Sequence, residues 1–228
     1  MSLMRNFHKN NLKMYLEKEG HKDDADDILK DKKTQEKIVR LFSNEVDALV
    51  TQELKYMTDS DKEKHMYSAI VTMAMDTAYS KVGMSNSDCK KHILGNWKFM
   101  MVPFYKGIKS RLKRASERPD GKSPIEELAD YATSGTLSVY KDFNPEMLGM
   151  KSGNSYGFNL NRCLFYECFQ RHGKGERVGS IMCDFDCIMA EAISPWVEFN
   201  HNSTIARGGS CCKFRYCTKG MDPSKLEW

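Results

Sequence analysis

Cysteine and carboxylate side chains gather in the C-terminal part of this 228-residue sequence, where seven of the eight cysteines lie after residue 160. In the stretch GSIMCDFDCIMAEAISP (179–195), Cys183 stands three residues before Asp186 and four before Cys187, and Glu191 follows Cys187 by four. On a helix these spacings place side chains roughly along one face. Such a face could form one wall of a site in which thiolate and carboxylate act together. It could also be plain packing, because a free cysteine behaves as a small hydrophobe.

Asp186 is the least easily explained of these residues, because a carboxylate on an otherwise apolar helix needs a cation, a metal or a bound substrate as its partner. Cys183 and Cys187 form a C-x3-C pair, which differs from the C-x2-C spacing of structural zinc sites. A mixed cysteine and aspartate site for a divalent metal such as zinc, assembled from distant elements, stays open as an alternative. Cys211 and Cys212 open the last strand-like segment, and we expect only one of them to point inward.

Two histidines and two arginines could assist such a site. His172 or His201 could serve a cysteine as a base. Arg162, beside Cys163, and Arg207, beside a glycine turn, could hold an anionic group of a substrate, because guanidinium forks match carboxylates. The alternative for each is an ordinary surface or capping role.

The elements that must position these residues differ between the two halves of the chain. Residues 5–117 show a predominantly helical pattern of apolar and charged positions. One helix is expected to be capped by Ser60 and to stop at Gly83. Another covers residues 85–116, and Pro103 should kink or divide it. The polar cluster SERPDGKSP then marks the best boundary in the chain.

After this boundary, strand-like alternation and short helical patterns follow one another. The expected order is strand 135–143, strand 155–163, helix 163–173, helix 176–193, strand 196–206 and strand 210–218, the last two joined by the turn at Gly208-Gly209. This order predicts an α+β fold with an antiparallel sheet and two helices in residues 121–228. The helical N-terminal region, residues 1–120, is expected to cover this sheet, so that both parts form one structural domain.

Composition narrows the classes of function. The sequence is 40% hydrophobic and 29% charged, which favours a soluble globular protein. The net charge of +4 gives no reason to expect a nucleic-acid partner, and the basic run 107–118, which could touch phosphate, is more simply a solvated helix end. No stretch predicts a membrane span or a signal peptide. We therefore expect a cytoplasmic protein with reduced cysteines and no membrane partner. The sequence gives no signal for an oligomeric state.

Residues from about 130 to 217 resemble the L-2-aminothiazoline-4-carboxylate hydrolase family. The resemblance rests on four ordered elements: a cysteine that opens a short helix, a C-x-x-D pair on the next helix, a glycine turn, and a C-x-F element on the final strand. Here they are Cys163, Cys183 with Asp186, Gly208-Gly209, and Cys212 with Phe214. His201 departs from the pattern, since an arginine is expected there. The same region is also similar to ligand-binding domains of the vinyl-reductase type.

The resemblance implies a hydrolase that opens a small cyclic amidine at the carbon between sulfur and nitrogen. Asp186 would then hold the amidine, and Cys163, Cys183 or Cys212 would be the nucleophile. Alternatively, these cysteines and Asp186 would bind a metal that activates water. Arg162, His201 and Arg207 are the expected substrate-binding residues. The second class of function is a non-catalytic small-molecule-binding or metal-sensing domain with a cysteine-lined pocket.

Overall fold

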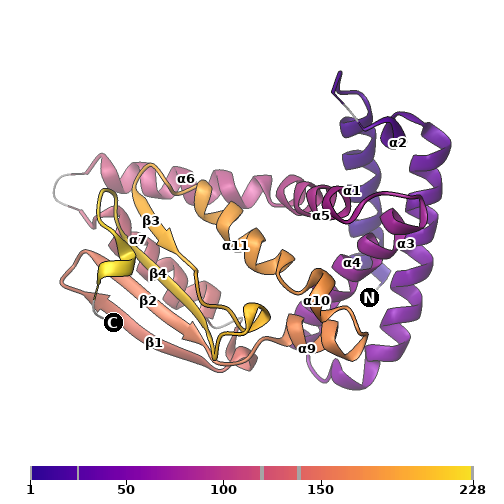
Figure 1. The fold of residues 1–228 in the computed structure, drawn as a ribbon. Coiled ribbons are helices and arrows are strands. Elements are labelled where there is room, and N and C mark those ends of the chain that lie inside the picture. Colours follow the sequence, from indigo (N-terminus) through magenta and orange to yellow (C-terminus); the bar gives the residue numbers. More distant parts are fainter. Residues whose placement is uncertain (1, 25, 119–120, 138–139, 227–228) are drawn as a thin grey trace. The chain divides into compact units, whose positions relative to one another are not determined.

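The structure is a computed structural model that describes residues 2–24, 26–118, 121–137 and 140–226 (Figure 1). The chain forms two compact units. The first contains residues 1–100 together with 168–181, and the second contains residues 101–167 and 182–228. Among the described residues, no helix is both long enough and apolar enough to cross a membrane.

The first unit is helical. Its elements are α1 (Ser2–Gly20), α2 (Asp27–Lys30), α3 (Lys32–Glu53), α4 (Ser60–Lys81), α5 (Asn86–Met100), the end of α9 (Leu164–Arg171), α10 (Gly175–Val178) and the 3₁₀ turn Leu54–Tyr56. The side chain of Asp31 caps α3 by accepting from the amides of Lys33 and Thr34. Asp59, and not Ser60 as predicted, caps α4, because it is the aspartate that lies in extended backbone and reaches the amides of the first turn.

Helix α4 is buried along most of its length, with Met66, Ile70 and Met73 among its covered residues. The segment 168–181 contributes cations to this helix. Asp76, of which 4% of the side chain is exposed, lies 3.0 Å from Nζ of Lys174 and 2.7 Å from Nε of Arg177. A buried carboxylate needs such partners, so the helical unit is completed by residues that are distant in sequence.

The second unit combines helices with one sheet. Its elements are α6 (Val102–Ser116), α7 (Pro124–Tyr131), the π-helical turn Ala132–Thr136, the 3₁₀ turn Lys141–Phe143, β1 (Pro145–Lys151), β2 (Ser155–Leu160), the start of α9, α11 (Ile181–Glu191), β3 (Val197–Asn200), the 3₁₀ turn Ile205–Arg207, β4 (Cys212–Thr218) and the 3₁₀ turn Pro223–Lys225. Pro103 lies in the first turn of α6 and separates it from α5, which confirms the predicted division. Ser123 and Glu126 form a capping box that starts α7.

The four strands form an antiparallel sheet in the order β1-β2-β4-β3, and Figure 1 shows β4 between β2 and β3. Phe158 pairs with Phe214, and their rings stack with centroids 4.6 Å apart. Tyr216 continues this face toward Phe199 of β3, whose ring centroid lies 4.8 Å away. One face of the sheet is therefore aromatic. It belongs to the core that also contains Leu128 of α7.

The α+β class with an antiparallel sheet is confirmed, but two elements differ from the prediction. Residues 135–137 and 140–143 do not form a strand, because α7 continues into the π-helical turn and a 3₁₀ turn follows; Ser138 and Val139 lie outside the described residues. The missing strand is β1, farther along the chain. The predicted helix 176–193 divides at Gly179-Ser180 into α10 and α11. A single domain, with helices covering the sheet, stays a prediction.

Candidate active site

Cys212 is the first residue of β4 and pairs with Leu160, which places its side chain on the aromatic face of the sheet. The side chain is buried. Its Sγ accepts a hydrogen bond from the backbone N–H of Ile205 at 3.4 Å and a second one from the thiol of Cys163. Two donors directed at one sulfur atom favour its thiolate form.

The glycine turn before β4 aims the Ile205 amide at this sulfur. Gly208 has a φ of 86°, in the left-handed region that favours glycine. At Gly209 a Cβ atom would stand 2.7 Å from Oγ of Ser203 and 3.0 Å from the carbonyl oxygen of Thr204. Both positions therefore require glycine, and the tight turn that results folds residues 203–205 back against Cys212.

Cys163 lies directly before α9, where its carbonyl accepts the N–H of Glu167 and begins the helix. Its Sγ lies 3.5 Å from the backbone nitrogen of Tyr166. The hydrogen bond to Cys212 and burial raise the pKa of Cys163, so this thiol stays protonated. The same hydrogen bond, the Ile205 amide and the charge of His201 outweigh burial and lower the pKa of Cys212 to about 7. The pair is therefore a thiol that donates to a thiolate.

His201 follows β3; its Nδ1 has a hydrogen-bond acceptor, and its Nε2 faces a carboxylate at ion-pair distance. Nδ1 lies 2.9 Å from the carbonyl oxygen of Lys213, and Nε2 lies 3.4 Å from Oδ2 of Asp186 and also interacts with Cys183. The imidazole ring packs against Phe214 with centroids 4.1 Å apart. Burial opposes charging of the ring, but the interactions with Asp186 and Cys183 prevail and raise the pKa of His201 to about 10. The residue is an imidazolium at neutral pH.

Helix α11 supplies Cys183, which is buried, and Asp186, of which 35% of the side chain is exposed. Burial raises the pKa of the Asp186 carboxyl, against the opposing influence of His201 and Arg207. Two tyrosines that the sequence reasoning missed belong to the same surroundings. Burial, reinforced by the charge of Asp186, raises the pKa of Tyr140 and of Tyr216. A neutral hydroxyl near a carboxylate is a hydrogen-bond donor to it or to its ligand.

Cys163, Cys183, Asp186, His201 and Cys212 form what we call the thiol–imidazolium cluster. They come from the start of α9, from α11, from the loop after β3 and from β4, all within the second unit. Other residues on α11 differ from expectation. Cys187 and Glu191 are exposed, so the predicted face of four side chains is reduced to two. Cys211 and Cys212 are both buried, because Cys211 precedes the strand and does not follow its alternation.

The two predicted arginines and the second candidate histidine lie in different places. Arg207 forms an ion pair with Asp184 of α11, and its charge reaches Asp186. Arg162 forks onto Glu167, with Nε and Nη2 at 2.6 and 2.7 Å from the two carboxylate oxygens. His172 belongs to the first unit, where its Nε2 lies 2.9 Å from Oε1 of Glu53. Of these three, Arg207 acts on the cluster, because its charge opposes the rise in the pKa of Asp186.

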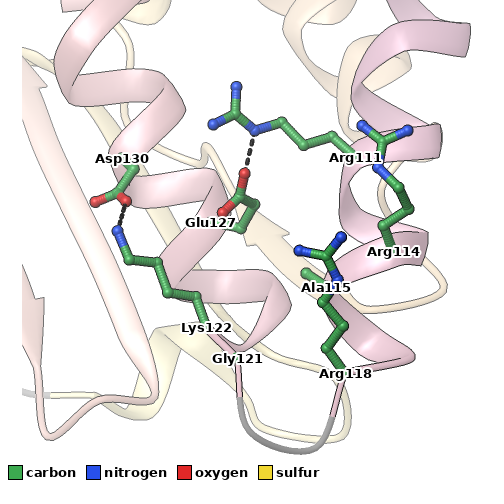
Figure 2. Close-up of a pocket in the computed structure, with 8 residues that line it drawn as sticks. All are labelled: Arg111, Arg114, Ala115, Arg118, Gly121, Lys122, Glu127 and Asp130. Carbon is green, nitrogen blue, oxygen red and sulfur yellow. Dashed lines mark hydrogen bonds and ion pairs between the residues drawn. The ribbon is translucent and has the colours of Figure 1, made fainter.

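A cavity of about 510 Å³ lies between α6 and α7, and none of the residues that line it belongs to this cluster (Figure 2). Four cationic side chains and two carboxylates line it: Arg111, Arg114, Arg118, Lys122, Glu127 and Asp130. Arg111 pairs with Glu127 and Lys122 pairs with Asp130. Arg114 donates to Oγ of Ser110. Arg111 and Arg114 of the basic run 107–118 therefore have partners within the protein.

The fold and the cluster define an α+β protein whose second unit presents a polarised cysteine beside an imidazolium–carboxylate pair, an arrangement suited to nucleophilic hydrolysis. The chain belongs to the L-2-amino-thiazoline-4-carboxylic acid hydrolase family, which matches residues 63–216. Every member of the cluster falls within this range. Family membership supports a hydrolase-like function. No curated protein and no solved structure matched the chain.

Proposed function

We propose that this protein hydrolyses a small cyclic amidine of the thiazoline type, as the name of its family describes. The observation that carries the proposal is the meeting of a thiolate-favouring Cys212 with the His201–Asp186 pair in one cluster. A packing role alone would not need a buried thiol with two hydrogen-bond donors, or an imidazolium beside it. The cluster contains a nucleophile, an acid and an anion.

Each charged group has a matching part in such a substrate. The Asp186 carboxylate holds the cationic amidine, because two N–H groups of an amidinium match two carboxylate oxygens. Arg207, which Asp184 fixes in place, holds the substrate carboxylate. Arg162 is a weaker candidate for this role, since Glu167 already engages its guanidinium fork. Tyr140 and Tyr216, whose neutral hydroxyls feel the charge of Asp186, would donate hydrogen bonds to this carboxylate or to its ligand.

In the first chemical step, the Cys212 thiolate adds to the amidine carbon and forms a C–S bond. The tetrahedral adduct then collapses, and the bond from this carbon to the ring sulfur breaks. His201 gives a proton to the leaving sulfur, so that a free substrate thiol and an enzyme-bound isothiourea result. The protonated state of His201 suits this role as a general acid.

In the second step, water adds to the isothiourea carbon and returns a proton to His201. Departure of Cys212 as a thiolate releases the N-carbamoyl product, so that one water is consumed per turnover. A metal-activated water is the alternative route. Among the described residues, the cluster does not bring three ligand atoms within 4.8 Å of one another, which favours the cysteine route. Cys163, Cys183, Asp186 and Cys212 stay candidate ligands in the alternative.

The test is ring opening of L-2-amino-thiazoline-4-carboxylate, followed as release of substrate thiol. Wild type and Cys217→Ser should both turn over, whereas Cys212→Ser should not. Cys217 is a matched control because it is a buried cysteine on the same strand, five residues away and thus on the opposite face. Binding of this compound without turnover would support the sensing alternative. Equal activity in Cys212→Ser and wild type would exclude the cysteine route.

A further inference from the structure

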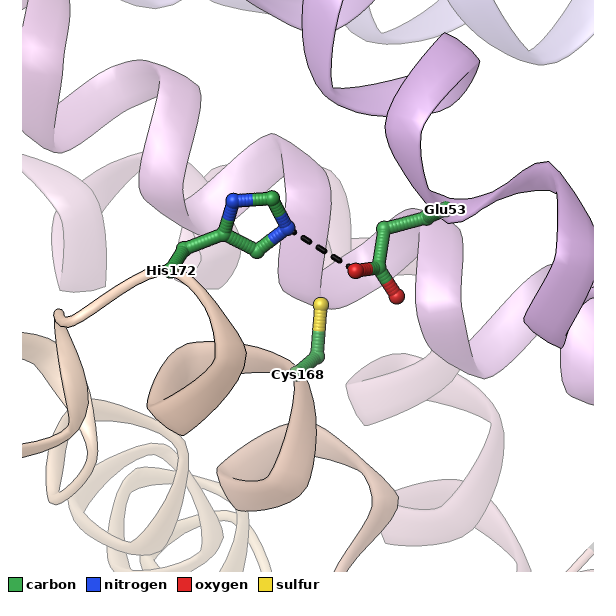
Figure 3. A group of neighbouring side chains, drawn as sticks. All are labelled: Glu53, Cys168 and His172. Carbon is green, nitrogen blue, oxygen red and sulfur yellow. Dashed lines mark hydrogen bonds and ion pairs between the residues drawn. The ribbon is translucent and has the colours of Figure 1, made fainter.

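A second group of chemically competent side chains lies in the first unit, at the ends of two helices. Glu53 is the last residue of α3, and Cys168 and His172 stand four residues apart at the end of α9. Their ligand atoms all lie within 4.8 Å of one another. Figure 3 shows the Cys168 sulfur pointing into the space between the His172 ring and the Glu53 carboxylate.

This donor set matches zinc. Sulfur, imidazole nitrogen and carboxylate oxygen are the ligands that zinc takes in proteins, at about 2.0–2.3 Å. In a tetrahedral site these bond lengths separate neighbouring ligand atoms by about 3.4–3.6 Å. Oε1 of Glu53 and Nε2 of His172 are 2.9 Å apart, so they need to spread by only about half an ångström. The Cys168 sulfur lies within 4.8 Å of both atoms, so rotation of these side chains would bring all three ligand atoms to the separations that zinc requires.

The surroundings hold the carboxylate in a suitable orientation. Nη2 of Arg171 donates to Oε2 of Glu53 at 2.5 Å, which leaves Oε1 facing His172. Nε of Arg171 makes a longer contact of 3.2 Å with Oε1, and its guanidinium group packs on the ring of Tyr56. Carboxylate ligands of metals are commonly fixed by a second hydrogen bond of this kind. Only 2% of the Glu53 side chain and 13% of the His172 side chain are exposed, so most of the site is shielded from bulk water.

We propose that Glu53, Cys168 and His172 bind one zinc ion, with water or a further group as fourth ligand, and that this ion fastens the end of α9 to the end of α3. The role is structural, because burial leaves little room for a substrate. The ion would take the place of the proton that Nε2 of His172 donates to Glu53, and this proton would move to Nδ1 or leave to solvent; the thiol proton of Cys168 would leave to solvent as well. This site is independent of the proposed hydrolase chemistry.

The experiment uses the full chain and Co²⁺ as a spectroscopic probe in place of Zn²⁺. Wild type should take up one ion per chain and show a thiolate-to-cobalt charge-transfer band. Cys168→Ser should lose the band, and His172→Gln should weaken cobalt binding at least tenfold. The double variant that carries both Cys163→Ser and Cys212→Ser should keep the charge-transfer band and the binding of one ion per chain. Addition of a chelator to the zinc form should lower the melting temperature of wild type but not that of Cys168→Ser.

Two results would overturn the proposal. One is a wild-type protein that binds no cobalt with a thiolate band, in which case Glu53, Arg171 and His172 form an ion-pair network only. The other is a band that survives in Cys168→Ser and vanishes in Cys163→Ser/Cys212→Ser, which would move the metal to the thiol–imidazolium cluster. A circular-dichroism spectrum of each variant shows whether it is folded. Neither result depends on whether the protein opens a thiazoline ring.

Discussion

Nε2 of His201 lies 3.4 Å from Oδ2 of Asp186, while Nδ1 of the same ring lies 2.9 Å from the carbonyl oxygen of Lys213. An imidazole that donates from one nitrogen to a carbonyl and faces a carboxylate at the other is favoured in its doubly protonated form. The distance to Asp186 is that of an ion contact and exceeds that of a short hydrogen bond. Nε2 can therefore turn its proton toward a leaving group without first breaking a strong bond.

Asp186→Asn keeps the size of the side chain and removes its charge. We expect the ring-opening rate to fall by roughly tenfold to over a hundredfold, because a charged hydrogen bond is worth about 1.5–3 kcal/mol. The protein should stay folded, since an amide still hydrogen-bonds at this position. Steady-state kinetics together with thermal unfolding checks both expectations.

Glu198→Gln provides the matched control for loss of one negative charge. Glu198 lies on β3, three residues before His201, and pairs with Lys219 at 2.8 Å. Its removal should leave the rate within a factor of about two of wild type, because exposed ion pairs contribute little. An undiminished rate in Asp186→Asn would show that the assigned role of Asp186 is wrong.

Cys212 should be the first thiol of the cluster to react with iodoacetamide at neutral pH, because its pKa is lowered to about 7 while that of Cys163 is raised. In Cys163→Ala the thiol donor is gone, so the pKa of Cys212 should rise and its alkylation at pH 7 should slow. Mass spectrometry of peptides from timed reactions identifies the modified residue. Preferential labelling of Cys163 would reverse the assignment. Exposed Cys187 serves as the internal reference for reagent activity.

The rate of the proposed reaction should depend on pH as a bell-shaped curve. Activity should rise as pH increases through about 7, because Cys212 loses its proton there. It should fall as pH increases through about 10, because His201 then loses the proton that it must donate. In His201→Gln the upper limb should disappear along with most of the activity. A profile without an acid limb near 7 would count against a Cys212 nucleophile.

The raised pKa of His201 also predicts a stability profile. Since the folded-state pKa is about 10 and the ordinary value is 6.5, the folded state binds the proton more tightly. The stabilisation is fully present below pH 6.5 and is lost as pH rises through 10. The difference in free energy of unfolding between wild type and His201→Gln should therefore narrow over this interval. Urea unfolding at several pH values measures it.

The segment 168–181 should offset the free-energy cost of burying the Asp76 carboxylate, because it supplies the two cations that pair with it. Lys174→Met combined with Arg177→Met removes both cations within 3.0 Å of the carboxylate and should lower the free energy of unfolding by about 3–5 kcal/mol. Adding Asp76→Asn should restore most of this loss, because the stranded charge is then gone. Urea unfolding of the single, double and triple variants tests this. Equal stability of the double and triple variants would refute it.

Much of the fold could be predicted because its signals are local. The helical first hundred residues follow apolar periodicity, and the division at Pro103 follows from the missing amide hydrogen of proline. The strand β1 was missed because Pro145 and Gly149 are typical strand breakers. Both are tolerated here, since β1 is an edge strand whose register shifts between Met147 and Gly149. Residues 135–143 alternate like a strand, yet those described there continue a helix and then turn.

The sequence was enough to predict most residues of the candidate site, but it was not enough to predict which of them contact one another. Cys163, Cys183, Asp186 and Cys212 followed from residue type, spacing and family resemblance. That His201 pairs with Asp186, and that Cys163 donates to Cys212, depends on long-range packing of helices and loops against the sheet, which no local pattern contains. No sequence pattern singles out Tyr140. It comes near Cys163 and Asp186 only through the tertiary structure.

The pairing of Leu160 with Cys212 makes the reactive sulfur a reporter of strand alignment. A slip of one residue between β2 and β4 would turn Cys212 to the polar face of the sheet and would bring Cys211 or Lys213 to its place. An insertion in the loop between β3 and β4 would therefore be silent only if it left this alignment intact. The rate at which Cys212 reacts with a thiol reagent would then reveal a shifted alignment of β2 and β4, which a circular-dichroism measurement of sheet content would miss.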